Sequence, residues 1–492
     1  MKSLPFKRLF ATLGSLGLVV GLTVTLSQIR AAEENNYDYL LPDITKMKPL
    51  EDQIPVSFVS RSSNRAEWEK LPGYWNEVPG ANGKKVVKIK LPLGINLLPP
   101  VPIENPITVA KWKLGKEVFF DKVISSDNSV SCSSCHEPSK GYSDMRKTSL
   151  GIAGNIGGMN APTVFNSVYN RFMFWDGRMD TLEAQAHGPI GNPSEMFDGK
   201  GKALHEAVKR IRLKGDYSKR FEEVFGALPT VDSIAKAIAT YERLVIIGNS
   251  LVDRAEVAMR ARVEEEEGNK FEVNAKDYEK VLKEAVAKKD TNSLEAIGFD
   301  PAKDVAKIPQ IAASINNGRV LFFNKARCNS CHVGENFTDY TFHNLGVGAK
   351  NGKLLEGQEG RINSQPTGHK DPSMMGAFKT PPLRGLTKSR PYLHDGSEAT
   401  LEAVIDFYDR GGNVNEFLDS KMRDTQAEQA YLDAAKSGKP YTGPKPELIT
   451  KSGLPIIPFK LNLTPQEKAD LVLYLKALEG EALDPIVADP AK

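Results

Sequence analysis

Four cysteines carry the clearest chemistry in this 492-residue chain, and they form two copies of one pattern. The copies read Cys132-Ser133-Ser134-Cys135-His136 and Cys328-Asn329-Ser330-Cys331-His332. Two thiols three residues apart can form thioethers to both vinyl groups of one porphyrin, and the adjacent histidine then binds the iron. The spacing therefore predicts two covalent c-type haems. A redox dithiol and half of a zinc site are the alternatives, but neither requires a histidine directly after the second cysteine.

The first 33 residues have the order of an export signal, with Lys2, Lys7 and Arg8 before the uncharged stretch 9–26. Bacterial thioether attachment occurs outside the cytoplasm, so we expect the protein in the periplasm or another extracytoplasmic compartment. The segment 27–32 is a poor cleavage site, and the apolar run approaches the ~20 residues that span a bilayer. A retained membrane anchor is therefore the alternative to a cleaved signal peptide.

The composition is that of an ordinary globular protein, with 40% hydrophobic residues and room for two or three domains. A net charge of +3 argues against a nucleic-acid partner. Prolines recur through residues 34–105 and predict an extended arm over the surface. The charged segment 258–313 predicts an inserted, solvated helix pair, and 481–492 is a short tail.

The elements around the two cysteine motifs repeat. The segment Gly115-Lys116-Glu117-Val118-Phe119-Phe120 resembles Gly318-Arg319-Val320-Leu321-Phe322-Phe323, and each reads as the end of an amphipathic helix. Trp175-Asp176-Gly177 and the following Thr181-Leu182-Glu183-Ala184 match His394-Asp395-Gly396 and Thr400-Leu401-Glu402-Ala403, 219 residues later. Helical periodicity also covers 235–246 and 467–478. These patterns predict a mainly α fold of two homologous haem domains, 106–257 and 314–480, related by internal duplication.

Several further motifs carry a family resemblance. They are Asn160-Ala161-Pro162-Thr163, Phe174-Trp175-Asp176-Gly177-Arg178, Gly188-Pro189-Ile190, Asn192-Pro193-Ser194-Glu195-Met196 and Pro391-Tyr392-Leu393-His394-Asp395-Gly396. Together with the two cysteine motifs, they resemble the bacterial di-haem cytochrome c peroxidases and their MauG-type relatives over about 106–480. The resemblance implies two cytochrome-c-like domains, with a peroxidatic haem in the first and an electron-transfer haem in the second.

The first haem should have an open coordination position. Many family members carry a distal histidine in the loop that corresponds to 148–158, but no histidine occurs between His136 and His187 here. Pro189, which the resemblance places over the iron, has no ligating atom. Glu195 matches the family's distal acid and Gln185 the amide beside it, and a carboxyl in an apolar pocket retains a proton for cleaving the O–O bond. We expect His187 at the surface, with the pocket rim as the alternative.

The second haem should differ. The residue 219 positions after Pro189 is Tyr408, in a segment similar to MauG-type proteins, where a tyrosinate binds the second iron. The alternative is a packed tyrosine, with Met374 or Met375 as the ligand. The resemblance also implies that Trp175 relays electrons between the haems.

The resemblance further implies a calcium ion at the domain interface. Its ligands would be the Asn160 side chain and the backbone carbonyls of Ser389 and Pro391, because calcium favours hard oxygen ligands. His394 is expected at this interface, without a catalytic role.

Three functions follow from these residues. The first is an exported peroxidase that reduces hydrogen peroxide with electrons from a small cytochrome c or cupredoxin. The second is a MauG-like oxidase that modifies aromatic residues of a partner protein. The third, a non-enzymatic electron carrier, has no use for Glu195 or for an open first haem. A second copy of the chain is a further candidate partner.

Overall fold

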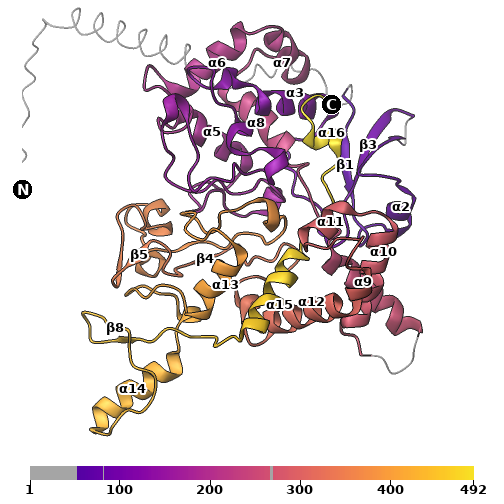
Figure 1. The fold of residues 1–492 in the computed structure, drawn as a ribbon. Coiled ribbons are helices and arrows are strands. Elements are labelled where there is room, and N and C mark those ends of the chain that lie inside the picture. Colours follow the sequence, from indigo (N-terminus) through magenta and orange to yellow (C-terminus); the bar gives the residue numbers. More distant parts are fainter. Residues whose placement is uncertain (1–52, 81–82, 266–269) are drawn as a thin grey trace, which may run out of the picture.

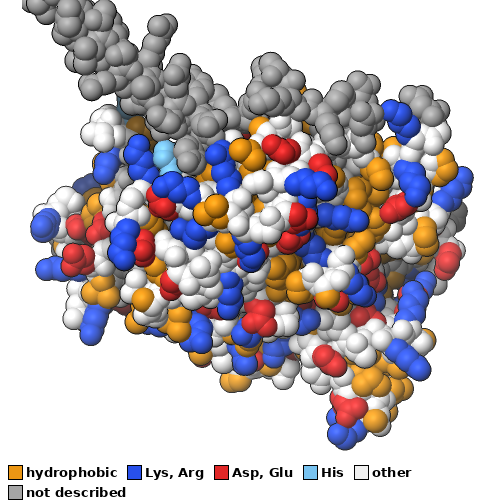
Figure 2. Space-filling model, turned by 90° about the horizontal axis from the view of Figure 1, so that it is seen from above, with side chains coloured by type: hydrophobic (Ala, Val, Ile, Leu, Met, Phe, Trp, Pro, Cys, Tyr) orange, Lys and Arg blue, Asp and Glu red, His pale blue; other side chains and the backbone are white. Residues whose placement is uncertain are grey.

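The computed structural model describes residues 53–80, 83–265 and 270–492 (Figure 1). The predicted leader, 1–33, lies outside the described residues. Within the described ranges, no helix combines the length and the apolar character needed to cross a bilayer. On the face drawn in Figure 2, basic and acidic side chains are interspersed, as the small net charge predicts.

The first half of the molecule is built on six helices around one apolar core. They are α3 (Val109–Phe120), α4 (Cys132–Cys135), α5 (Leu182–Gly191), α6 (Ala203–Leu213), α7 (Tyr217–Phe225) and α8 (Val231–Glu242). Thr108 caps the start of α3 by accepting a hydrogen bond from the Lys111 amide. Helices α3 and α8 cross closely because Gly115 has no side chain: a Cβ there would lie 1.8 Å from the Ala237 carbonyl oxygen.

The second half repeats this arrangement with α12 (Ile308–Phe323), α13 (Leu401–Asp409) and α15 (Pro465–Lys476). Gly318 allows α12 to cross α15, since a Cβ at this position would lie 2.0 Å from the Asp470 carbonyl oxygen. Three short antiparallel pairs complete this half: β4 (Phe342–His343) with β7 (Phe378–Lys379), β5 (Ala349–Lys350) with β6 (Lys353–Leu354), and β8 (Leu448–Ile449) with β9 (Pro455–Ile456). Helix α14 (Thr425–Ser437) projects away from the rest of the chain (Figure 1).

The 219-residue spacing found in the sequence also holds for local structure. A 3₁₀ turn at Ser167–Tyr169 recurs at Leu386–Lys388. The isolated bridge between Met173 and Met179 recurs between Tyr392 and Glu398. Each bridge leads to a helix that is capped by a threonine, Thr181 before α5 and Thr400 before α13. The two halves therefore present α5 and α13 from equivalent frameworks.

The described part of the proline-rich segment, 53–80 and 83–105, differs from the predicted extended arm. It forms a mixed sheet of order β1-β3-β2, made by β1 (Val56–Val59), β2 (Trp75–Pro79) and β3 (Lys85–Lys90), together with α2 (Arg65–Lys70). Strand β3 is parallel to β1 and antiparallel to β2. Its alternating residues Val87 and Ile89 are fully buried in the core of the first half. The prolines lie mainly outside the strands, and this alternation specifies the sheet.

The charged segment is helical, as predicted, but it is not simply solvated. It contains α10 (Ala275–Ala287) and α11 (Thr291–Ala296), and α9 (Leu251–Glu265) begins before the predicted boundary at 258. Tyr278, Leu282 and Ala285 of α10 are fully buried in the core of the second half. The helices are therefore amphipathic, with most of their charges on the outer face and with buried Asp277 paired to Arg262 at 2.8 Å.

The predicted tail returns to the first half (Figure 1). Helix α16 (Pro485–Ala488) buries Val487 completely in the first core. The Lys116 ammonium donates hydrogen bonds to the carbonyls of Ile486 at 2.7 Å and Asp489 at 2.6 Å. The C-terminal helix α16 therefore packs against the first half of the molecule.

The glycine crossing of α3 and α8 gives a stability prediction. Gly115→Ala should destabilise the haem-loaded protein by about 1–3 kcal/mol, because the new methyl group overlaps backbone atoms of α8. Gly191→Ala is the matched control, since a Cβ at Gly191 meets open space at the end of α5. Thermal unfolding midpoints compare the two variants, and an unchanged midpoint for Gly115→Ala would contradict the close crossing.

Candidate active site

The first cysteine pair lies on the short helix α4, and His136 directly follows it. The His136 Nδ1 atom lies 3.1 Å from the Tyr142 carbonyl oxygen. A carbonyl can only accept, so Nδ1 carries the proton and Nε2 keeps its lone pair for a metal ion. Burial lowers the pKa of His136, which favours this neutral form.

The second cysteine motif has the same geometry. The His332 Nδ1 atom lies 2.8 Å from the Phe337 carbonyl oxygen, and burial lowers the pKa of His332 to about 4. Tyr142 and Phe337 both adopt left-handed backbone conformations, with φ of 54° and 55°. The same turn thus supplies the carbonyl that orients each imidazole.

An apolar cavity adjoins the second motif. Cys328, Cys331 and His332 line it together with aliphatic and aromatic side chains that include Phe322, Leu345, Val404, Ile405, Phe459 and Leu461. Two thiols, one neutral imidazole and apolar walls form the donor set and the surroundings that a covalently attached haem requires. The residues present therefore fit the group that the sequence motif predicts.

Tyr408 lines this cavity. It lies on α13 one turn after Val404, so both side chains lie on one face of the helix. Burial raises the pKa of Tyr408 well above its usual range, and so does the proximity of the two cysteine sulfurs. Neither Met374 nor Met375 is among the described residues that line the cavity, whereas Met422 is. The alternative methionine of the second site is therefore Met422.

Glu195 lies near the first cysteine pair. Burial raises the pKa of the Cys135 thiol to about 11, although a hydrogen bond with Ser149 opposes this shift. The nearby carboxylates of Asp144 and Glu195 raise this pKa further. Burial also raises the pKa of Glu195 itself, although Asn192 donates a hydrogen bond of 2.5 Å to its Oε1 atom. A carboxyl group with a raised pKa retains its proton to higher pH than an exposed one.

The loop 148–158 is fastened to the Glu195 segment. The Ile152 amide donates to the Glu195 carbonyl at 2.8 Å, and the Asn155 side chain donates to the Pro193 carbonyl at 3.0 Å. Gly151 permits this approach, because a Cβ there would lie 2.2 Å from the Ser194 carbonyl oxygen. The loop thus supports the Glu195 segment, and its sequence contains no histidine.

Helix α5 carries Gln185 and Pro189, which lie one turn apart and therefore on one face. In the structural repeat, these positions correspond to Val404 and Tyr408, whose side chains line the second cavity. His187 is half-buried, and its Nε2 atom lies 3.4 Å from the Val231 carbonyl at the start of α8. His187 therefore connects α5 to α8 and is not simply a surface residue.

Trp175 lies between the two halves. Its indole Nε1 donates to the Asn160 carbonyl at 2.9 Å, and its own carbonyl accepts from the Lys379 amide at 2.8 Å. The ring lies 6.4 Å from that of His394, which stacks on Phe378. Burial lowers the pKa of His394 to about 4. These contacts place Trp175 at the boundary of the second cavity, whose wall it forms in part.

The residues expected to bind calcium line the same cavity. Asn160, Ser389 and Pro391 all line it, although they come from opposite halves of the chain. Asn160 is buried, and its side-chain amide donates to the Arg146 carbonyl at 2.8 Å. The side-chain oxygen of Asn160 and two carbonyls are hard donors of the kind that suit calcium.

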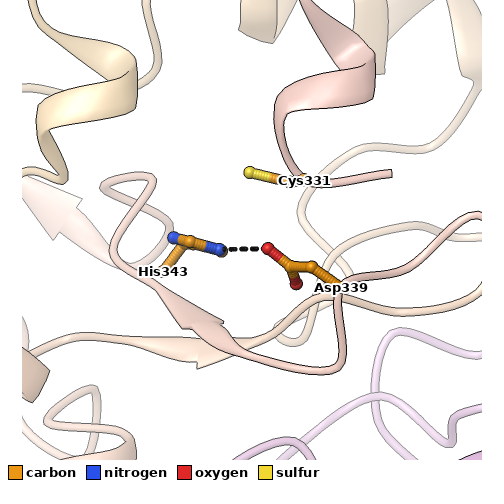
Figure 3. A group of neighbouring side chains, drawn as sticks. All are labelled: Cys331, Asp339 and His343. Atoms are coloured by element: carbon orange, nitrogen blue, oxygen red, sulfur yellow. Dashed lines mark hydrogen bonds and ion pairs between the residues drawn. The ribbon is translucent and has the colours of Figure 1, made fainter. Parts of the chain in front are cut away.

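A charged cluster beside Cys331 escaped the sequence analysis (Figure 3). His343 lies 2.8 Å from Asp339 through Nε2 and 2.7 Å from Asp419 through Nδ1. Burial opposes the charge on His343, but these bonds outweigh it and raise the pKa of His343 to about 11. The Lys421 ammonium lies 3.7 Å from the Cys331 sulfur and 3.5 Å from Asp339. Two fixed cations and two carboxylates therefore adjoin the second attachment site.

Comparison with known proteins places this geometry in a family. A sequence model of the di-haem cytochrome c peroxidases matches residues 109–260. The methylamine utilization protein MauG of Methylorubrum extorquens is 31% identical over 365 residues, which cover 72% of this chain and 84% of that protein. The cytochrome c551 peroxidase of Nitrosomonas europaea is 30% identical over 371 residues, which cover 75% and 90% of the two chains.

Solved structures agree. A crystal structure of a MauG-like protein associated with microbial copper homeostasis matches with a TM-score of 0.57 and 26% identity, covering 82% of this chain and 99% of that one. The diheme peroxidase BthA from Burkholderia thailandensis shares the fold, with a TM-score of 0.50 and 17% identity. The chain therefore belongs to the di-haem cytochrome c peroxidase family and is an oxidoreductase of that family.

Proposed function

We propose that this protein is an exported di-haem peroxidase that reduces hydrogen peroxide to water with electrons from a small redox protein, a cytochrome c or a cupredoxin. Two covalent c-type haems would be held by the cysteine pairs, with His136 and His332 as iron ligands. The observation that carries the proposal is that the two sites orient their histidines in the same way but present different residues at the equivalent position of the facing helix. One repeat presents Pro189 where the other presents Tyr408.

The first site supports peroxide reduction through its proton donor. A bound haem supplies an iron that can take up peroxide and exchange electrons. Glu195 holds a proton in a half-buried position and can deliver it to the leaving oxygen. Pro189 offers no ligating atom, so it would leave a bound iron accessible to peroxide. Gln185, one turn before Pro189, can orient the bound molecule by hydrogen bonding.

The second site supports electron exchange. Tyr408 lines the cavity that contains His332, and a phenolate ligand there would favour oxidised iron. Trp175, at the boundary between the halves, offers an oxidisable ring for transfer between the two haems. The repeated turns, bridges and caps support an origin of the two halves by internal duplication.

A MauG-like oxidase that acts on a partner protein is the second candidate. Tyr408 favours it, because tyrosinate ligation is the feature that the chain shares with MauG-type proteins. A MauG and a cytochrome c551 peroxidase have similar sequence identity to this chain, 31% and 30%, so identity does not decide between the two functions. Steady-state assays with peroxide and reduced cytochrome c or cupredoxin separate the two: rapid donor oxidation supports the peroxidase, and its absence, despite peroxide consumption, supports the oxidase.

Asn160, with the carbonyls of Ser389 and Pro391, is the proposed calcium site. It would join the two halves beside Trp175, because its ligands come from both. Metal analysis before and after chelation tests this assignment, and a protein that holds no calcium after purification in calcium-containing buffer would overturn it.

Haem stoichiometry tests the basis of the proposal. A pyridine haemochrome assay should return two haems per chain, and acidified solvent should extract neither, because each is held by two thioethers. Double variants Cys132→Ala/Cys135→Ala and Cys328→Ala/Cys331→Ala should each retain one covalent haem. A single haem in the native protein would contradict the prediction.

Glu195→Gln should preserve haem content and slow peroxide turnover roughly 10²–10⁴-fold, as expected for the loss of a positioned acid. Because burial raises the pKa of Glu195, the native rate should fall as the pH rises through that value. This limb of the pH profile should be absent from Glu195→Gln. Glu206→Gln is the control, because Glu206 lies on α6 and is not among the buried residues of that helix. This variant should keep the pH profile of the native protein. An unaltered rate in Glu195→Gln would remove this residue from the reaction.

Tyr408→Met should raise the reduction potential of the second haem and permit a mixed-valence form, because a thioether favours reduced iron more than a phenolate does. Met422→Leu should leave the potential unchanged if Tyr408 is the ligand. Redox titration and electron paramagnetic resonance distinguish the variants. A shift confined to Met422→Leu would assign the ligand to Met422.

A further inference from the structure

A continuous row of oxidisable rings leads away from the first site. Tyr142, whose carbonyl orients His136, places its hydroxyl 2.8 Å from that of Tyr241. The Tyr241 ring lies 6.4 Å from Trp112, and Trp112 lies 4.7 Å from Trp75. Tyr142, Tyr241 and Trp112 are fully buried, whereas Trp75 is half-buried on β2. The row therefore runs from the proximal side of the first haem site to the edge of the N-terminal sheet.

The second half shows that packing alone does not require an oxidisable ring at the positions of Trp112 and Tyr142. Gly115 and Phe119 of α3 correspond to Gly318 and Phe322 of α12, and by the same spacing Trp112 corresponds to Ile315, which is also fully buried. Phe337 takes the place of Tyr142, with the same backbone bond to the histidine. Tyr241 does have a counterpart, because the fully buried Tyr474 of α15 contacts Phe322 as Tyr241 contacts Phe119. Ile315 and Phe337 resist oxidation, so the second half lacks the oxidisable rings that adjoin this tyrosine in the first half.

We propose that Tyr142, Tyr241, Trp112 and Trp75 form a discharge route, through which oxidising equivalents leave the first site for the protein surface when peroxide arrives faster than the electron donor. The inference rests on the proposed peroxidase function. It adds a protective activity, and it assigns the N-terminal sheet the task of placing Trp75 at the end of the route.

The electron balance is as follows. Hydrogen peroxide takes two electrons and two protons to give two waters. When no donor supplies them, one electron can come from Trp75 through Trp112, Tyr241 and Tyr142, and the other from the haem iron that the second half would hold. Glu195 and water supply the two protons. Trp75 is left oxidised by one electron, and its indole N–H releases a proton to water. A small one-electron reductant of the phenol class can then restore it.

The route should end at the ring that can release its proton to solvent after it is oxidised. The Tyr241 hydroxyl donates to the Val487 carbonyl at 3.1 Å, and a carbonyl is too weak a base to take the proton. Among the described residues, Trp112 Nε1 has no hydrogen-bond partner, and the Lys116 ammonium lies 5.4 Å from its ring, which disfavours a positive charge there. Of the four rings in the row, Trp75 alone is partly exposed, so it is the one that can release a proton to solvent.

The experiment adds peroxide to the haem-loaded protein, without a donor, in the presence of a nitroso spin trap. Peptide mass spectrometry then locates the trapped radical. We expect the adduct on Trp75, and we expect its loss in Trp75→Phe, Trp112→Phe and Tyr142→Phe. Tyr142→Phe introduces the residue type that the second half has at the equivalent position, Phe337. Peroxide turnover with an electron donor should be unchanged in Trp75→Phe and Trp112→Phe, because neither residue contacts His136 or Glu195 in the site described above.

Two controls make the outcome decisive. Tyr278→Phe alters a buried tyrosine of the second half that lies outside the row, and it should leave the Trp75 adduct intact. Trp68, half-buried on α2, reports non-specific oxidation, and it should not be labelled as strongly as Trp75. An adduct on Trp75 that persists in Tyr142→Phe and Trp112→Phe, or equal labelling of Trp68, would overturn the route. Absence of peroxide consumption would instead contradict the proposed function.

Discussion

The hydrogen bond from each proximal histidine to a backbone carbonyl is the interaction around which both halves are organised. A buried imidazole must satisfy Nδ1 internally if Nε2 is to remain a ligand. The chain meets this requirement twice, with a left-handed residue that turns its carbonyl toward the ring. The helix pair α3/α8 packs in the first half and α12/α15 in the second. Gly115 and Gly318 let the backbones of each pair approach closely, which fixes how the two helices pack. Small backbone features thus set the orientation of the two histidines that we propose as iron ligands.

The proposed functional difference between the halves rests on a few side chains on this shared framework. Helix α5 presents Pro189 and helix α13 presents Tyr408, although both helices begin at a threonine cap after the same kind of bridge. The first half adds Glu195 on a segment held by the loop 148–158, and the second adds the His343 cluster beside Cys331. Equivalent backbones can therefore support peroxide chemistry on one side and electron exchange on the other.

Much of the site could be predicted from the sequence because its signals are local or repeated. The cysteine motifs identify their histidines directly, and the 219-residue spacing locates Tyr408 in the second cavity without an alignment. The sheet at 56–90 was missed because its prolines outweighed the alternation in Lys85–Lys90. The His343 cluster was missed for a different reason. His343 is joined to Asp419 across 76 residues, and nothing in either segment indicates the other. The same separation explains why Met422, and not Met374, is the methionine at the cavity.

The return of α16 to the first half has a consequence for the order in which the protein matures. Tyr241 and Lys116 form hydrogen bonds with carbonyls of residues 486–489, and Val487 is fully buried between them. The domain that is synthesised first therefore cannot finish its core until nearly the whole chain has been made. Domains usually fold as units in the order of synthesis. Here a nascent chain that already contains the first cysteine pair still lacks Val487, a fully buried part of the core against which Cys132 packs.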